Sequence, residues 1–183
     1  MELWVVLGIL AAAAFWAIAT YNGLVGGRNQ VENAWRQIDV QLKRRHDLIP
    51  NLVEVAKDSM GYEQETLMKL VEARGRAMAA GSRHEAIAAE GALSAALGRF
   101  FALAENYPQL RANEQIGALM EELTSTENRI AFARQHYNDS VMAQNNRVQQ
   151  FPGSLVAGPF GFGRQEYFAV PEAETQPVKV DLR

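Results

Sequence analysis

The 183-residue sequence contains no cysteine, which excludes disulfide bonds, thiolate catalysis and cysteine-ligated metal sites. It also lacks an excess of positive charge, because its 18 basic residues are outnumbered by 21 acidic residues and both kinds are spread along the chain. Nucleic-acid-binding domains usually carry a basic face. We therefore expect no nucleic-acid partner.

Histidine is scarce, and the three that occur, His46, His84 and His136, lie in separate segments. None of them follows a glutamate at the Glu-x-x-His spacing that di-metal helical bundles use. The sequence also lacks a Gly-x-Ser-x-Gly motif and a glycine-rich phosphate loop that follows a strand. We predict no catalytic residues, no metal, no cofactor and no enzymatic activity.

Charged residues are absent from positions 3–27, and positions 3–19 are almost continuously apolar. A membrane-spanning helix needs roughly 20 mostly apolar residues, so this segment is long enough. A cleaved signal peptide is the alternative, since residues 17–19 resemble a small-x-small cleavage site. Signal peptides begin with a basic region, however, and here only Met1 and Glu2 precede the apolar run. We predict a retained transmembrane anchor at residues 1–22.

Lysine and arginine occur only on the C-terminal side of this anchor, first at Arg28 and Arg36 and then at positions 43–45. Membrane proteins retain such residues on the cytoplasmic side. The sequence therefore predicts a single-pass protein whose main body is cytoplasmic.

No segment before residue 150 shows the alternation of a strand. Apolar residues instead recur at three- and four-residue steps, which is typical of amphipathic helices. We predict that the anchor continues as one long helix to residue 59, kinked near Pro50, and that a helix over 62–80 follows. Ser82 and Glu85 form a capping-box pattern that starts a third helix, and Asn113 is the expected N-cap of a second long helix that ends near residue 150.

Short loops make neighbouring helices antiparallel. The predicted fold is therefore an all-α antiparallel bundle at residues 23–150, in which a short helical hairpin packs against the distal half of the first long helix and a second long helix runs back. Where a residue of the first long helix faces a residue of the second at the same height of the bundle, their two residue numbers add up to about 172. The second long helix then returns to the level of Tyr21, at the membrane surface.

The segment "QLKRRHDLIPNL", at residues 41–52, gathers charges within the first long helix. The predicted register places Arg44 and Arg45 at the level of Glu127 and Asn128. These charges lie either on solvated outer faces, where they contribute little, or in a partly buried polar layer that fixes helix register at a cost in stability. The residues expected in such a structural polar layer are Arg44, Asp47, Asn51, Glu127 and Arg129.

The tail at residues 151–183 is rich in glycine and proline but also in aromatic residues, unlike most disordered tails. It either packs back on its own bundle or contacts the membrane interface or a neighbouring subunit. The residues expected to make the latter contacts are Phe151, Leu155, Phe160 and Phe162. Residues 178–182 alternate in polarity and could add to a sheet as an edge strand.

Three stretches, "YNGLVGGRNQVENAWRQIDVQLKRRHDLIPNLVEVAK", "ENYPQLRANEQIGALMEELTSTENRIAFARQHYND" and "FPGSLVAGPFGF", resemble the LemA family and together cover nearly the whole chain. The resemblance implies one N-terminal anchor, an antiparallel helical bundle and a bacterial inner (plasma) membrane location. It implies no known catalytic activity. One branch of the family is associated with magnetosome membrane formation, and genes near many family members encode a membrane metalloprotease.

Two functions follow as expectations. The first is a non-enzymatic structural protein that contacts the lipid bilayer and self-assembles into a homo-oligomer, which organises or remodels membrane. The second is a membrane-anchored adaptor for an envelope quality-control partner such as a membrane metalloprotease. In the adaptor, the partner would be held at the bundle tip, formed by residues 59–62 and 106–112.

Overall fold

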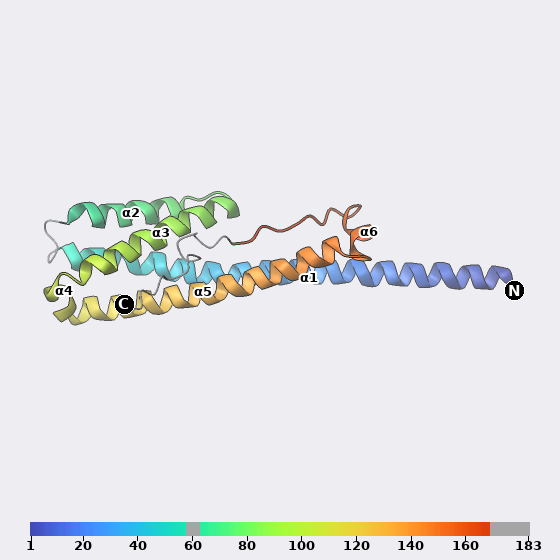
Figure 1. The fold of residues 1–183 in the computed structure, drawn as a ribbon, viewed down its shortest axis with the longest axis horizontal. Coiled ribbons are helices and arrows are strands. Elements are labelled where there is room, and N and C mark those ends of the chain that lie inside the picture. The colour runs from blue at the N-terminus through green and yellow to red at the C-terminus, as the bar shows by residue number, and fades with distance from the viewer. Residues whose placement is uncertain (58–62, 169–183) are drawn as a thin grey trace, which may run out of the picture. The chain divides into compact units, whose positions relative to one another are not determined.

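The computed structural model describes residues 1–57 and 63–168, and no strand occurs within these ranges. The helices are α1 (Glu2–Lys57), α2 (Gln64–Met78), α3 (Arg83–Ala104), α4 (Pro108–Ala112), α5 (Glu114–Gln149) and α6 (Gly153–Ala157) (Figure 1). The predicted all-α bundle with a long N-terminal helix is confirmed. The predictions for residues 59–62 and 178–182 lie outside the described residues.

The predicted helix starts coincide with observed caps. Ser82 Oγ accepts a hydrogen bond of 3.2 Å from the Glu85 N–H at the start of α3. Asn113 Oδ1 accepts the N–H groups of Gln115 and Ile116 at the start of α5, at 3.0 and 3.3 Å. These side chains satisfy backbone donors that have no partner within the first helical turn.

The helices α4 and α6 were not predicted from the sequence. Each has five residues, which is too short for a three- and four-residue periodicity to be recognised. Pro108 opens α4 at a position where its missing N–H costs nothing, because that N–H would have no partner inside the helix.

Contacts divide the chain into two compact units, and α1 and α5 contribute residues to both. Among the described residues, the anchor unit consists of residues 1–38 and 133–167, and the bundle unit consists of residues 39–57, 63–132 and 168. The boundaries proposed from the sequence, at residues 22 and 150, stay a prediction.

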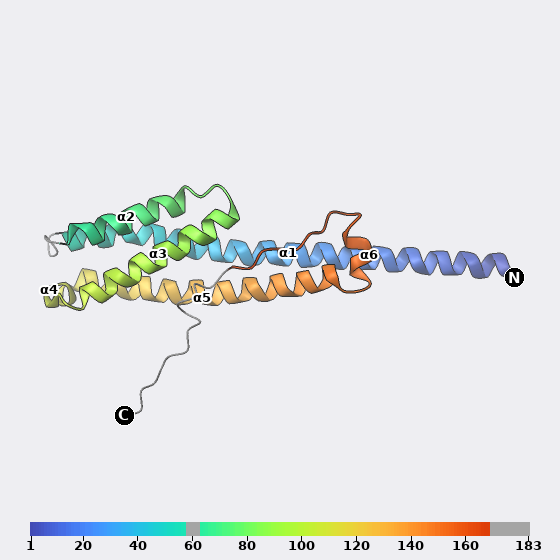
Figure 2. The same ribbon diagram turned by 45° about the horizontal axis from the view of Figure 1, so that its top comes forward.

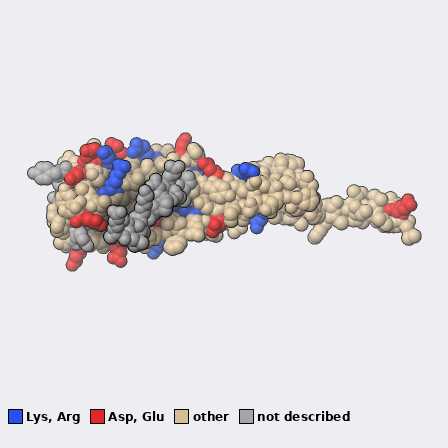
Figure 3. All heavy atoms as spheres, viewed as in Figure 1, with Lys and Arg blue, Asp and Glu red and all other residues tan. Residues whose placement is uncertain are grey.

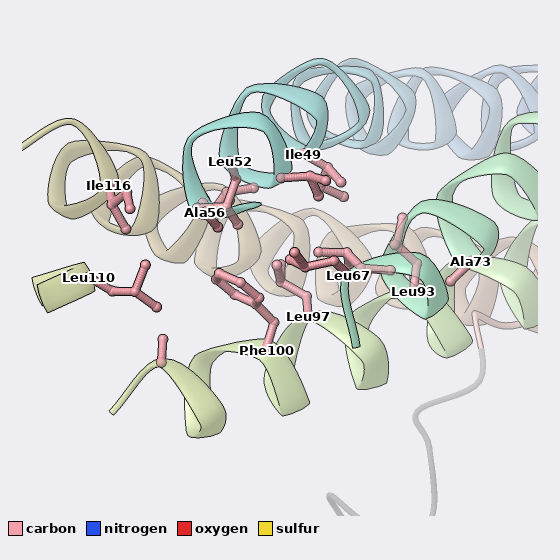
Figure 4. Close-up of a cluster of buried hydrophobic side chains, with 14 of the residues drawn as sticks. Ile49, Leu52, Ala56, Leu67, Ala73, Leu93, Leu97, Phe100, Leu110 and Ile116 are labelled. Carbon is pink, nitrogen blue, oxygen red and sulfur yellow. The ribbon is translucent and has the colours of Figure 1, made fainter. Parts of the chain in front are cut away.

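The bundle unit has a continuous apolar core (Figure 4). The helices α2 and α3 lie side by side in both ribbon views (Figures 1 and 2). Five helices contribute fully buried side chains, represented by Leu52, Leu70, Phe100, Leu110 and Ile116. Burying each such side chain stabilises the fold by about 1.5–3 kcal/mol.

The anchor unit has a smaller core in which Leu24 of α1 packs with Val156, Ala157 and Phe162. Further along α1, Trp35 stacks edge-on against Tyr137 of α5, with ring centroids 5.4 Å apart. The first fifteen residues of α1, at positions 2–16, are all exposed. Figure 3 shows this part of the helix as a surface with charged atoms only near its tip.

Two described helices, α1 and α3, have the length and composition of membrane spans. The apolar stretch of α1 has 0% of its residues buried within the protein, whereas that of α3 has 28%. On α3 the buried residues Leu93, Leu97 and Phe100 belong to the core of the bundle unit. We therefore treat α3 as a bundle helix and α1 as the helix available to a membrane.

Candidate functional site

Arg45 of α1 is completely buried at the centre of a polar cluster in the bundle unit. Its Nη1 donates hydrogen bonds to Ser94 Oγ at 2.6 Å and to Glu127 Oε1 at 2.5 Å. Its Nη2 pairs with the carboxylate of Glu90, which is 2% exposed. Ser94 in turn donates to the second carboxylate oxygen of Glu127 at 3.1 Å. One guanidinium therefore links α1, α3 and α5.

A second side chain of α1 reaches the same carboxylate. His46 Nε2 lies 2.8 Å from Glu90 Oε1, and the His46 backbone carbonyl accepts a 2.7 Å hydrogen bond from Arg74 Nε of α2. Burial raises the pKa of the Glu90 carboxyl, but the close contact with His46 and the charge of Arg45 lower it and outweigh burial. The pKa of Glu90 therefore lies below its ordinary value, and the carboxylate is ionised near neutral pH.

The five residues predicted to form the polar layer differ in their burial and in their ion-pair partners. Glu127 lies in the cluster, whereas Arg44 pairs with Glu122, with 47% and 36% of the two side chains exposed. The remaining three are exposed: Asp47, Asn51 and Arg129. Successive helical residues point about 100° apart, so the residue directed into the bundle is Arg45, next in sequence to the predicted Arg44.

Sequence reasoning missed Glu90, Ser94 and His46. A signal for Glu90 was present, because it stands three residues after Ile87 and three before Leu93, both of which are buried. A glutamate at the i+3 position of a buried stripe faces the core and needs a cationic partner there. The partner could not be identified from α3 alone.

The arrangement of the cluster suits structural pairing of helices. Removing one member of a buried ion pair is strongly destabilising, so a cluster with three connected helices disfavours alternative registers. Within residues 1–57 and 63–168, no group of three or more histidine, aspartate or glutamate side chains could hold a metal ion.

In the anchor unit, the chain turns back against α1 immediately after α5. We call residues 151–163 the tail hook. Phe162 is 7% exposed and packs against Tyr21 and Leu24 of α1, so the hook lies on its own helices at this point. By contrast, Phe151 and Phe160 are 76% and 62% exposed.

Leu155 resembles these two exposed aromatic residues and is 62% exposed. Of the four side chains expected to contact lipid or a neighbouring subunit, Phe162 is thus occupied by the chain's own α1, and the other three are available. The ring of Phe151 lies 6.1 Å from that of Trp16, and Phe160 lies 5.0 Å from Tyr21. The expected return of the chain to the level of Tyr21 is confirmed.

Polar contacts join α1 to α5 in the anchor unit and hold the segment that follows the hook. Gln144 Nε2 donates to the Leu24 carbonyl at 3.2 Å. The side chain of Asn145 makes two hydrogen bonds with the Gln165 backbone, accepting its N–H at 2.8 Å and donating to its carbonyl at 3.0 Å. Tyr137 Oη donates to the Glu166 carbonyl at 2.8 Å. These bonds fix the segment after the hook along α5.

Comparison with known proteins adds the family. The sequence profile of the LemA family matches residues 34–182, which is most of the chain. The chain belongs to the LemA family. The match to the LemA profile contains both the Arg45 cluster and the tail hook, and the apolar run of α1 precedes it.

This LemA family protein has distant relatives among magnetosome proteins. Magnetosome proteins MamQ 1 and MamQ 2 of Paramagnetospirillum magneticum are each 24% identical to it over 201 residues, which are 94% of this chain and 74% of theirs. Magnetosome protein MamQ of Magnetospirillum gryphiswaldense is 23% identical over 206 residues, which are 97% and 76% of the two chains.

Proposed function

We propose that this LemA family protein is a non-enzymatic structural protein of the bacterial plasma membrane. In this proposal, it is anchored by α1 and self-assembles into a higher-order oligomer that organises or remodels the membrane. The observation that carries the proposal is the tail hook, which returns exposed apolar side chains to the end of an exposed apolar helix. The similarity to magnetosome proteins supports a role at a membrane.

The exposed residues of the hook are suited to contact between neighbouring anchor units. Leu155 and Phe160 keep more than half of their surface exposed, although Val156 and Ala157 beside them are buried. The hook is locked to the long helices, so these side chains are held outward in a fixed arrangement. Apolar groups presented in this way favour burial against a second surface.

The mass of the full-length protein in mild detergent, measured by light scattering and electron microscopy, tests the proposal. We expect a large particle of many copies for the wild type and much smaller species for Leu155→Ser/Phe160→Ser. Tyr167→Ser, which changes an exposed aromatic outside the hook, is the control and should assemble like the wild type. A wild-type monomer, or normal assembly of the double variant, would contradict the proposal.

The charges of the anchor unit support a cytoplasmic body. Arg28, Arg147 and Arg164 all belong to this unit and lie on the C-terminal side of the apolar run, whereas no lysine or arginine precedes that run. Because the chain lacks cysteine, Gln135→Cys would introduce a single thiol at an exposed position. A membrane-impermeant thiol reagent should label it in lysed but not in intact spheroplasts, and labelling of intact spheroplasts would reverse the orientation.

An adaptor function is the alternative, and one feature of the bundle unit favours it. A groove of about 600 Å³ between α1 and α2 is lined by Val53, Leu67, Met68 and Val71, with Lys57 and Glu72 among the polar residues at its edge. Such a groove could receive an apolar segment of a partner such as a membrane metalloprotease. A protein without residues 151–183 should still capture the partner if this alternative holds, whereas an assembly scaffold should fall apart.

A further inference from the structure

A small pocket of about 250 Å³ opens in the anchor unit directly after the apolar run of α1. Its α1 side is formed by Thr20, Gly23 and Leu24, and its other side includes Arg147, Gln150 and Phe151. A bilayer's hydrocarbon core accommodates roughly 20 helical residues. With residues 3–19 in the hydrocarbon, Thr20 and Gly23 lie at the depth of the lipid headgroups.

The charge around this pocket has one sign. The segments that build the membrane-proximal part of the anchor unit, residues 20–31 and 140–165, contain the arginines Arg28, Arg147 and Arg164 and no aspartate or glutamate. Arg28 lies over the Phe162 ring, with its Cζ 5.2 Å from the centroid, and Arg164 donates to Gln149 Oε1 at 2.5 Å.

In the described part of the chain, none of these three arginines forms an ion pair with a carboxylate. The Arg147 side chain is exposed and lines the pocket. Its guanidinium is therefore available to an anion from outside the protein. A guanidinium binds phosphate with two parallel hydrogen bonds, which gives this group both charge and geometry for the task.

The pocket also has an apolar border on the side of the membrane. Phe151 lines it and is 76% exposed, and its ring lies 6.1 Å from that of Trp16 within the apolar run. Aromatic residues favour the boundary between headgroups and acyl chains. A molecule that fills this site therefore needs an anionic head beside Arg147 and an apolar chain that follows Trp16 and Phe151.

We propose that the pocket between α1 and the α5–hook junction binds the headgroup phosphate of an anionic phospholipid through Arg147. In this arrangement, Thr20 and Gln150 offer further hydrogen bonds, and Arg28 and Arg164 add attraction for negatively charged lipid. The bound lipid would fill the space between α1 and the hook, so that a lipid molecule of the membrane forms part of the packing of the anchor unit. The proposal rests on the membrane anchoring of the proposed function and not on its self-assembly.

Native mass spectrometry of the full-length protein, released from detergent, tests this proposal. The protein is titrated separately with phosphatidylglycerol, with phosphatidylcholine and with inorganic phosphate. We expect clear retention of phosphatidylglycerol over phosphatidylcholine. Each arginine near a membrane surface adds attraction equivalent to about fivefold in binding, so Arg147→Gln should lower phosphatidylglycerol retention by about that factor.

Two variants serve as controls for charge and folding. Arg36→Gln removes an exposed arginine that pairs with Glu32 further along α1, and it should retain phosphatidylglycerol like the wild type. Arg147→Lys keeps the positive charge and should retain more of this lipid than Arg147→Gln. Far-ultraviolet circular dichroism of each variant verifies that the helices are intact.

Equal retention of the two lipids by the wild type would overturn the proposal, as would an unchanged preference for phosphatidylglycerol in Arg147→Gln. Displacement of the lipid by inorganic phosphate at equal concentration would also overturn it, because the site would then be one for a soluble anion. Particle mass is recorded for the same samples. Selective lipid retention by a monomer would contradict self-assembly alone, and a large particle without lipid selectivity would contradict the lipid site alone.

Discussion

Replacing Arg45 with leucine should destabilise the bundle unit far more than the same change at Arg44. Arg45 is fully buried and neutralises Glu90, which is only 2% exposed and cannot recover its charge balance from solvent. His46 Nε2 still lies 2.8 Å from this carboxylate, but losing the guanidinium partner of a buried charge costs about 3–5 kcal/mol. Arg44 pairs with Glu122 at the surface, where an ion pair contributes about 0–1 kcal/mol.

The free energy of unfolding, measured by urea titration with circular dichroism on the full-length protein in mild detergent, compares the two variants. Arg44→Leu is the matched control, because it makes the same chemical change at the adjacent position of the same helix. Arg45→Leu should strongly lower the urea concentration at which half of the protein is unfolded, and Arg44→Leu should leave that concentration nearly unchanged. Equal effects of the two changes would refute the assignment of Arg45 as the residue that links the helices.

A double-mutant cycle separates the ion pair from the loss of side-chain volume. Glu90→Leu alone leaves Arg45 with Glu127 as its remaining carboxylate, and it should also be destabilising. In Arg45→Leu/Glu90→Leu no deeply buried charge remains, since Glu127 is 27% exposed and can be hydrated. The double variant should therefore lose less free energy of unfolding than the two single variants lose in sum, and the difference should be about 2 kcal/mol or more. Simple additivity would refute the reasoning.

The remaining predictions concern pH and the hook. Because the pKa of Glu90 lies below its ordinary value, its ionised form stabilises the fold above about pH 4.3, and this contribution is lost as pH falls through the lowered pKa. Glu90→Gln should therefore have a lower free energy of unfolding than the wild type near neutral pH. The difference between the two free energies, measured by urea titration, should become smaller below about pH 4. A difference that stays constant with pH would contradict this prediction. Gly153→Ala would place a Cβ 1.9 Å from the Arg147 carbonyl oxygen and should loosen the hook by about 1–3 kcal/mol, seen as faster proteolysis there. Gly158→Ala, whose Cβ would meet nothing within 4 Å, is the control, and equal cleavage of both variants would exclude the clash as the cause.

The register of the two long helices could be predicted from the sequence alone. The prediction that facing residue numbers sum to about 172 follows from helix lengths and short loops. Two observed pairs match it, Arg45 with Glu127 in the bundle unit and Trp35 with Tyr137 in the anchor unit. Height along a helix depends only on the rise per residue, so a count of residues was sufficient.

Which side chain at a given height points inward could not be decided in the same way. Arg44 and Arg45 stand at almost the same height, yet one is 47% exposed and the other is buried. Rotation about the helix axis depends on which neighbours pack on each face. The contribution of α3, through Glu90 and Ser94, set that choice, and it was not visible in the sequence of α1 or α5.

For the tail hook, too, the sequence predicted the general character of the segment, and only the tertiary contacts decided which of its residues are buried. Its aromatic content indicated a packed or membrane-contacting segment, but both alternatives fitted the sequence equally well. The structure separates the residues by their contacts: Phe162 packs on α1, and Phe151 and Phe160 remain exposed.

The sequence by itself determined the helical class, the apolar run, the caps at Ser82 and Asn113 and the heights at which the long helices meet. These properties follow from local periodicity, capping and length, which a chain carries wherever it folds. Only the tertiary structure decided that Arg45 is the buried cation and that Phe162 is the buried aromatic of the hook. Burial depends on segments distant in sequence coming together, and a carboxylate on α3 or a leucine on α1 becomes a neighbour only once the helices have packed.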